Sequence, residues 1–308
     1  MKSTLKHYTP VALLMAGLVL LGAVCTALWG IPVASDDRRQ VLAVNYPLYL
    51  AARTVAGDTD TVQVTALGGN AAGCLHDYQL SPADRLAVSR ADRILLVGDS
   101  APFLQGLVTQ EQAVDTAVGL DLLCGDHRHG EHDHHDHGES VNDHVWMSPW
   151  RYRAQVQTVA HALAAMDPDN AAAYLANGDA FGQEIARMGE RLQQAAEGLP
   201  SRTCVVFHDS LTYLAEDLGL TVALSLNVGE DSGLSPGDLA RVQELVRQEP
   251  GLMILYDKQY SVRYAGVDGL VPSRQVLSLD TVVSGDRQGN DWLDAMEYNL
   301  QQLQGARG

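Results

Sequence analysis

The chain has 308 residues and a net charge of −17, which comes from 38 acidic and 21 basic residues. Hydrophobic residues make up 46% of it, so a chain of this length can bury a core and form two domains. The acidic balance argues against nucleic-acid binding, because neutralising phosphates requires a basic face. An acidic surface attracts cations, but it does not identify one.

The first 37 residues are predicted to be an export segment and not part of the fold. Lys2 and Lys6 precede residues 7–35, which include no Asp, Glu, Lys or Arg. This pattern is typical of a signal peptide, and the run is also long enough for a membrane anchor, which takes about 20 apolar residues. Cys25 adds a third alternative, lipid attachment. All three alternatives place the rest of the chain outside the cytoplasm, in the periplasm or at the cell surface, where disulfides can form.

Strand and helix patterns alternate through residues 38–166, the expected N-terminal lobe. One predicted helix has clear start signals, since Ser81 is an N-cap, Pro82 takes the first helical position and Asp84 completes a capping box. Alternation of this kind predicts a mostly parallel sheet covered by helices. The predicted strands are 41–45, 61–67 and 93–98, and the predicted helices are 48–57, 81–91, 101–110 and one that begins at the Ser148–Pro149 cap.

A long helix is predicted over residues 167–198. Asp167 is expected to cap it, Pro168 to begin it and Gly198 to end it. About thirty residues at 1.5 Å each would span ~45 Å, more than one small domain. Three internal glycines weaken the prediction of an unbroken helix. We therefore expect a stiff connector between two lobes.

The same alternation returns in residues 199–308, the expected C-terminal lobe. Another capping box runs from Ser235 to Asp238. The predicted fold class is α/β, with two lobes, each a mostly parallel sheet flanked by helices, joined by the long rigid helix. The predicted strands are 203–207, 221–226, 252–257 and 275–279, and the predicted helices are 209–219, 235–248, one near 261–270, and 291–304.

Four potential metal ligands lie near the expected carboxyl ends of strands. His208 and Asp280 each follow a predicted strand directly, His76 lies between a strand and a helix, and His144 precedes the Ser148 cap. Taken singly, each has an ordinary explanation, since a loop His is usually solvated and an Asp after a strand usually caps a helix. Their joint placement favours one metal site in the cleft between the lobes, because ligands of open α/β sheets bind beyond the carboxyl ends of strands.

Four segments also carry a family resemblance. Together they resemble the zinc/manganese solute-binding proteins of ABC-type metal importers, most closely the zinc-uptake members, from about residue 40 to the C-terminus. The resemblance implies a protein with no enzymatic activity that captures Zn(II) and hands it to an ABC permease and its ATPase, and we expect a monomer. The segments are "HDYQLSPAD" (76–84), "DHVWMSP" (143–149), "FHDSLTYLAEDLGL" (207–220) and "LSLDTVVSGD" (277–286) with the terminal "WLDAMEYNLQQL".

The resemblance implies a role for each donor. His76, in "HDY", and His144, in "DHVWMSP", would be ligands from the N-terminal lobe. His208, in "FHDS", would be the ligand from the C-terminal lobe, and Asp280, in "SLDTVV", the fourth ligand or its near neighbour. The chain departs from the family in two places, since "GCLHDY" replaces the usual Gly-x-x-Pro-His and no proline precedes His144. Neither departure removes a donor, but the first places Cys74 close to the site.

Three cysteines follow the export segment, so an odd one remains after any pairing. Cys74 and Cys124 both lie in expected loops that flank the histidines, and we predict that they form a disulfide. The alternative is that all three, Cys204 included, are buried thiols. Because the sequence has no CxxC motif, a cysteine-based zinc ribbon is excluded.

A histidine-rich loop is predicted at residues 125–142. Its acidic and glycine-containing composition cannot make a core, so we expect a mobile loop. We predict that it collects zinc weakly near the mouth of the cleft, and the alternative is a solvated spacer. The accessory ligands would be His127, His129, His132, His134, His135 and His137.

The choice of metal follows from the donors. Three imidazoles with one carboxylate favour zinc, since manganese is better served by oxygen. The alternatives are a manganese or other transition-metal binding protein of the same family, a zinc hydrolase, and an extracytoplasmic zinc store or adhesion protein. Against the hydrolase, no HExxH is present, and Asp280 would close the position that water needs.

Overall fold

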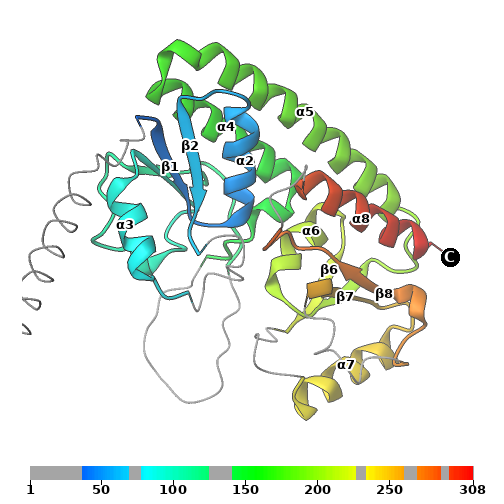
Figure 1. The fold of residues 1–308 in the computed structure, drawn as a ribbon. Coiled ribbons are helices and arrows are strands. Elements are labelled where there is room, and N and C mark those ends of the chain that lie inside the picture. The colour runs from blue at the N-terminus through cyan, green and yellow to red at the C-terminus, as the bar shows by residue number, and fades with distance from the viewer. Residues whose placement is uncertain are drawn as a thin grey trace, which may run out of the picture. The chain divides into compact units, whose positions relative to one another are not determined.

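Two four-stranded, entirely parallel sheets organise the compact unit formed by Arg39–Gly308 (Figure 1). The α/β fold class is confirmed. Among the described residues, no helix has both the length and the apolar character needed to cross a bilayer. The apolar run predicted as an export segment lies outside them. The computed structural model describes residues 37–68, 78–124, 141–226, 234–259, 269–285 and 291–307.

The N-terminal sheet has the strand order β2-β1-β3-β4. Its central strands are buried apolar segments, as a sheet covered on both faces requires. The three predicted strands are confirmed, while the edge strand β4 was not predicted because three residues carry no periodic signal. The strands are β1 (Arg39–Ala43), β2 (Val62–Ala66), β3 (Arg93–Leu96) and β4 (Ala113–Asp115), and the helices beside them are α2 (Tyr46–Ala56) and α3 (Pro82–Arg90).

The predicted helix at 101–110 is wrong. Only a single 3-10 turn, Pro102–Leu104, forms there, and the chain then enters a loop that leads to β4. Gly106 has a φ of 77°, which is the left-handed region and is incompatible with continuing a right-handed helix. The apolar side chains of this segment pack against the core from a loop.

The C-terminal sheet repeats the arrangement with the order β6-β5-β7-β8. In both sheets the order reverses beside the first strand, and such a switch point opens a crevice at the carboxyl ends of the two central strands. The helix predicted near 261–270 falls mostly outside the described residues. The strands are β5 (Thr203–Val206), β6 (Thr221–Ser225), β7 (Met253–Asp257) and β8 (Val276–Leu279), and the helices are α6 (Thr212–Asp217), α7 (Pro236–Gln248) and α8 (Asp291–Gly305).

The long helix forms as α5 (Ala171–Ala196), and it packs against α4 (Pro149–Met166), α2 and α8, with α8 along its C-terminal part (Figure 1). Its internal glycines do not break it. A Cβ at Gly178 would stand 2.6 Å from the Cβ of Ala160, so the missing side chain is what lets α5 lie directly on α4.

The start of this helix differs from the prediction. Pro168–Asn170 form a 3-10 turn, and Asp167 does not cap α5. Its carboxylate instead accepts hydrogen bonds from the hydroxyls of Thr61 and Tyr174, at 2.6 and 2.7 Å. These bonds, with one from the Asn170 amide, lower the pKa of Asp167. The carboxylate therefore ties the helix start to β2.

One hydrophobic cluster runs through both halves of this unit. Tyr152 on α4 and Trp292 on α8 are fully buried in it and stack with ring centroids 4.9 Å apart. Stacked aromatic rings of this size each bury a large apolar area. The two sheets are therefore joined by a shared core as well as by α5.

Candidate metal centre

His144 is buried at the start of the segment that leads into α4. It precedes a 3-10 turn, Val145–Met147, and Ser148 then caps α4 by accepting a hydrogen bond from the backbone N–H of Arg151. The cap predicted from the sequence is confirmed. Only 1% of His144 is exposed, so its ring is held in place by what surrounds it.

Asn142 fixes the orientation and the tautomer of the His144 ring. Its side-chain oxygen accepts hydrogen bonds from the backbone N–H of His144 at 3.0 Å and from the ring Nδ1 at 2.9 Å. Its amide nitrogen donates to the carbonyl of Asp209 at 2.9 Å, which determines which end of the amide is oxygen. Because an amide oxygen can only accept, Nδ1 of His144 carries the proton in the neutral ring. In that tautomer the lone pair of the ring is on Nε2, the nitrogen through which His144 could bind a metal ion.

His208 lies at the carboxyl end of β5, where the prediction placed it. The backbone N–H of the preceding Phe207 still bonds to Leu255 on β7, at 3.0 Å, and the chain then turns at His208 into a short 3-10 segment. The ring Nδ1 accepts a hydrogen bond from the N–H of Ser210 at 3.1 Å. A neutral ring with this contact carries its proton at Nε2, so a metal ion bound there requires the proton to move to Nδ1.

Asp209 completes a three-residue cluster with the two histidines. The His144 and His208 rings meet edge to face, with centroids 5.3 Å apart. The Oδ1 atom of Asp209 lies 3.2 Å from Nδ1 of His208 and 3.8 Å from Nδ1 of His144. One ligand atom from each residue lies within 4.8 Å of the others. If the proton of His208 moves to Nδ1 when an ion binds at Nε2, this carboxylate can accept it, as carboxylates behind metal-binding imidazoles do.

Sequence reasoning did not select Asp209. The only sequence signal was its position immediately after His208 in "FHDS". A carboxylate adjacent to a histidine at a strand end can cap the following turn, solvate freely, or face the ring, and the local sequence does not distinguish these outcomes.

Hydrogen bonds between buried groups hold the two halves of the site together. Besides the Asn142–Asp209 bond, the indole of Trp146 donates to the carbonyl of Thr281 at 2.8 Å. The indole of Trp292 donates to the carbonyl of Trp146 at 3.0 Å. Buried donors that satisfy carbonyls across an interface are costly to separate. The relative positions of His144 and His208 are therefore set before any ion arrives.

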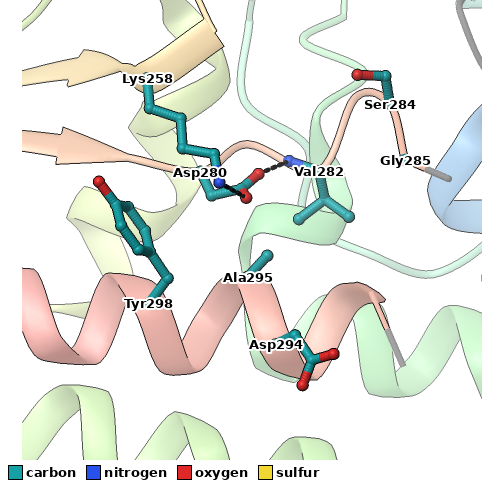
Figure 2. A pocket seen from close by; sticks show the side chains of 8 residues that line it. All are labelled: Lys258, Asp280, Val282, Ser284, Gly285, Asp294, Ala295 and Tyr298. Atoms are coloured by element: carbon teal, nitrogen blue, oxygen red, sulfur yellow. Dashed lines mark hydrogen bonds and ion pairs between the residues drawn. The ribbon is translucent and has the colours of Figure 1, made fainter. Parts of the chain in front are cut away.

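Asp280 follows β8 directly, as predicted, but among the described donors it does not join the two histidines. Its backbone is fixed by the buried side chain of Asn299, which accepts from the Asp280 N–H at 2.7 Å and donates to its carbonyl at 2.9 Å. Its carboxylate accepts the backbone N–H of Val282 and pairs with Lys258, whose Nζ lies 2.5 Å from Oδ2 (Figure 2).

Asp257, the last residue of β7, is a second carboxylate close to this site. Its pKa is raised to about 6, chiefly by burial and to a smaller extent by the negative charge of Asp280, while hydrogen bonds from Thr281 and from the backbone of Gln259, and the charge of His144, act in the opposite direction. The hydroxyl of Thr281 donates to Oδ2 of Asp257 at 2.5 Å. Asp257 is thus within electrostatic reach of both His144 and Asp280, so a cation bound between them would also favour its ionised form.

The remaining predicted site residues lie outside the described part of the chain. These are His76, Cys74 and the accessory histidines of the histidine-rich loop (125–142), and the roles assigned to them stay predictions. Cys124 is exposed and forms an isolated antiparallel bridge with Val141 across the base of this loop. The alternative of three buried thiols is therefore wrong for Cys124. Cys204 is a buried thiol, and burial raises its pKa to about 12.

Two curated proteins and one solved structure show what this chain resembles. The chain is 24% identical to the zinc-binding lipoprotein AdcA of Streptococcus pneumoniae over 290 residues, which cover 87% of this chain and 56% of AdcA. It is 29% identical over 266 residues to the high-affinity zinc uptake system protein ZnuA of Paracoccus denitrificans, covering 76% of this chain and 79% of that protein. The chain thus spans little more than half of the length of AdcA.

The solved structure is a Zn(II)-bound variant of AdcAII from Streptococcus pneumoniae. It superposes with a TM-score of 0.71 at 20% identity, and the match covers 88% of this chain and 99% of the other. At this identity the likeness establishes the fold. The family described as zinc-uptake complex component A, periplasmic, matches residues 41–306, which include both sheets and the histidine cluster, and the chain belongs to that family.

Proposed function

We propose that this protein captures Zn(II) outside the cytoplasm and delivers it to an ABC-type permease and its ATPase. The observation that supports this best is the pair of histidines, His144 and His208, which come from different halves of the fold and have ring centroids 5.3 Å apart. His76 is proposed as the third ligand, and Asp280 as the fourth ligand or its near neighbour. Family membership supports the same function, and so does the zinc in the names of both curated relatives.

The donor chemistry supports zinc over manganese. Imidazole nitrogens suit zinc, copper and nickel, whereas manganese prefers carboxylate, carbonyl and water oxygens. Copper and nickel would bind nitrogen donors at least as tightly in vitro, so selection of zinc in the cell would rest on geometry and on availability. An ion enclosed by four protein donors has no open position for a reactive water, which supports binding and transfer over hydrolysis.

Three further features complete the proposal. The first 37 residues export or anchor the chain, residues 38–166 and 199–308 act as two lobes, and the helix between them acts as a stiff connector. The histidine-rich loop collects zinc weakly near the tight site. A disulfide between Cys74 and Cys124 would stabilise the base of this loop, since Cys124 already bridges to Val141 there.

The test is a zinc titration of wild type and His208→Ala, monitored by calorimetry and by elemental analysis of the dialysed protein. Loss of a direct ligand should weaken tight zinc binding by more than the roughly 10–100-fold that loss of an orienting partner costs. His161→Ala is the matched control, because His161 lies exposed on α4. Equal zinc affinity in His208→Ala and wild type would refute the site. Turnover of activated esters by the zinc-loaded protein would favour the hydrolase alternative.

A further inference from the structure

Lys258 occupies an unusual position for a cation in this protein. It is the residue directly after β7, and Asp280 is the residue directly after the neighbouring strand β8. Figure 2 shows the Lys258 ammonium against the Asp280 carboxylate. Nζ is 2.5 Å from Oδ2 of Asp280 and 4.6 Å from the ring centroid of Tyr298 on α8. The chain has three lysines in all, and the other two are Lys2 and Lys6, so every other cationic side chain of the fold is an arginine or a histidine.

Both oxygens of the Asp280 carboxylate already have a partner. Oδ1 accepts the backbone N–H of Val282 at 2.9 Å, and Oδ2 pairs with Lys258. Val282 has a φ of 59°, an outlier for a β-branched residue, so the turn that presents the carboxylate is strained and is held by its surroundings. The backbone contact cannot move without this turn, whereas a lysine side chain can swing away. Each oxygen keeps a second lone pair, but an ion that binds at Oδ2 must compete with the positive charge of the ammonium there.

The surroundings allow the ammonium to be displaced. The carboxylate opens onto a pocket of about 290 Å³ that Lys258, Tyr298 and Ser284 also line. That volume holds several water molecules, each of which takes about 30 Å³ in the liquid, so a hydrated ion can reach the carboxylate. The ammonium already lies 4.6 Å from the centroid of the Tyr298 ring, and this contact can continue to stabilise it when it leaves Oδ2. The flexible stem and compact charge of lysine suit such a movement better than the fixed fork of arginine.

We propose that Lys258 is an intramolecular competitor for Asp280 and thereby determines which ions the site accepts. This inference rests on the proposed function, since it requires an ion bound by His144 and His208 within reach of Asp280. Zinc can be held by nitrogen donors with little help from the carboxylate, whereas manganese depends on oxygen donors. Competition for Oδ2 therefore weakens manganese binding more than zinc binding, and Lys258 biases the site toward zinc.

The test compares Lys258→Gln and Lys258→Arg with wild type in the full-length chain, by competition titrations with Zn²⁺ and with Mn²⁺. Because 39% of the Lys258 side chain and 14% of the Asp280 side chain are exposed, the ion pair is partly screened. Lys258→Gln should raise Mn²⁺ affinity by about two- to fivefold and Zn²⁺ affinity by less than about twofold. Lys258→Arg keeps the charge and should raise neither affinity; because a guanidinium fork leaves a carboxylate less readily than an ammonium does, Mn²⁺ affinity should stay at or below that of wild type.

The double variant Lys258→Gln with Asp280→Asn separates competition from a structural effect. If Lys258 acts through Asp280, the gain in Mn²⁺ affinity disappears when the carboxylate is absent, whereas a general loosening of the site would persist. Thermal unfolding of each metal-free variant checks that all of them fold.

A second readout follows the ammonium itself. Reductive methylation with ¹³C labels the three lysines of the full-length chain and its N-terminal amine, and absence of one signal in Lys258→Arg assigns Lys258. Saturation with Mn²⁺ should broaden or shift this signal, and saturation with Zn²⁺ should shift it, while those of Lys2 and Lys6 stay unchanged. An unchanged Mn²⁺-to-Zn²⁺ affinity ratio in Lys258→Gln would overturn the inference while tight zinc binding by wild type upholds the proposed function. Absence of zinc binding in wild type would overturn both.

Discussion

Replacement of Asn142 by alanine tests how the site is held before the ion arrives. The variant removes one hydrogen-bond partner from each of three buried groups: the backbone N–H of His144, its ring Nδ1, and the carbonyl of Asp209. The ring Nδ1 keeps Oδ1 of Asp143 at 3.3 Å, which moderates the loss. Each buried group left unsatisfied costs about 1–3 kcal/mol. Because water can enter the space that the amide leaves, we take the low end and expect a loss of about 3 kcal/mol in the free energy of unfolding.

Two assays measure this prediction. Thermal unfolding of the metal-free protein should show Tm lowered by roughly 6–12 °C, at about 2–4 °C per kcal/mol for a domain of this size. Zinc titration should show affinity reduced about 10–100-fold, because the ring of His144 loses the contact that fixes its tautomer. Asn177→Ala is the matched control, since its amide makes one hydrogen bond, to the Val55 carbonyl on α2, and none to the histidine cluster.

A second substitution separates the two effects. Asn142→Asp keeps an oxygen against the His144 ring but places another oxygen against the carbonyl of Asp209. It should lower Tm without a comparable loss of zinc affinity. If Asn142→Ala binds zinc as tightly as wild type, the argument that Asn142 prepares the Nε2 atom of His144 for the ion is wrong.

The remaining predictions concern packing, pH and the histidine-rich loop. Gly178→Ala should destabilise the protein by about 1–3 kcal/mol in thermal unfolding, because its Cβ would meet that of Ala160 at 2.6 Å, whereas Gly305→Ala, which meets nothing within 4 Å, should not. The folded-state pKa of Asp257 is raised from 3.8 to about 6, so the free energy of unfolding of the metal-free protein should fall by up to about 3 kcal/mol as pH rises from 4 to above 6. Urea unfolding at several pH values should show this fall in wild type and not in Asp257→Asn. Deletion of residues 126–139 should leave tight zinc binding intact and reduce the number of weak sites counted by calorimetry, and loss of the tight site would reverse the two assignments.

Local signals were sufficient wherever a few neighbouring residues determine a structure. The Ser-Pro-x-Asp boxes at Ser81 and Ser235 form as predicted, because an N-cap and its third residue contact each other within one turn. His208 and Asp280 could be placed at strand ends for a similar reason, since an apolar run that stops abruptly marks where the strand leaves the core.

Partners distant in the sequence explain what could not be predicted. Asp167 has every local feature of an N-cap, yet its carboxylate is taken by Thr61, 106 residues earlier. β4 is a strand only because β3 lies beside it. The pairing of Asp280 with Lys258, and not with the histidines, could not be predicted for the same reason. Lys258 follows β7 and Asp280 follows β8, and only the strand order of the sheet shows that these two strands are neighbours.

The contacts between the two halves of the fold limit how large a conformational change ion binding can cause. Separating them would break the bonds from Asn142 to Asp209 and from Trp146 to Thr281, and would expose the stacked rings of Tyr152 and Trp292. Burial of large aromatic side chains and satisfied buried carbonyls together contribute several kcal/mol, on the order of the whole stability of a typical domain. A conformational change of that size would consume much of the binding free energy of the ion. The alternative needs only a rotation of the Lys258 side chain away from Oδ2 of Asp280, with its contact to the Tyr298 ring kept and the backbone of Asp280 fixed by Asn299. We therefore expect zinc capture to change side chains at the ends of β7 and β8 while α5 and the shared core keep their positions.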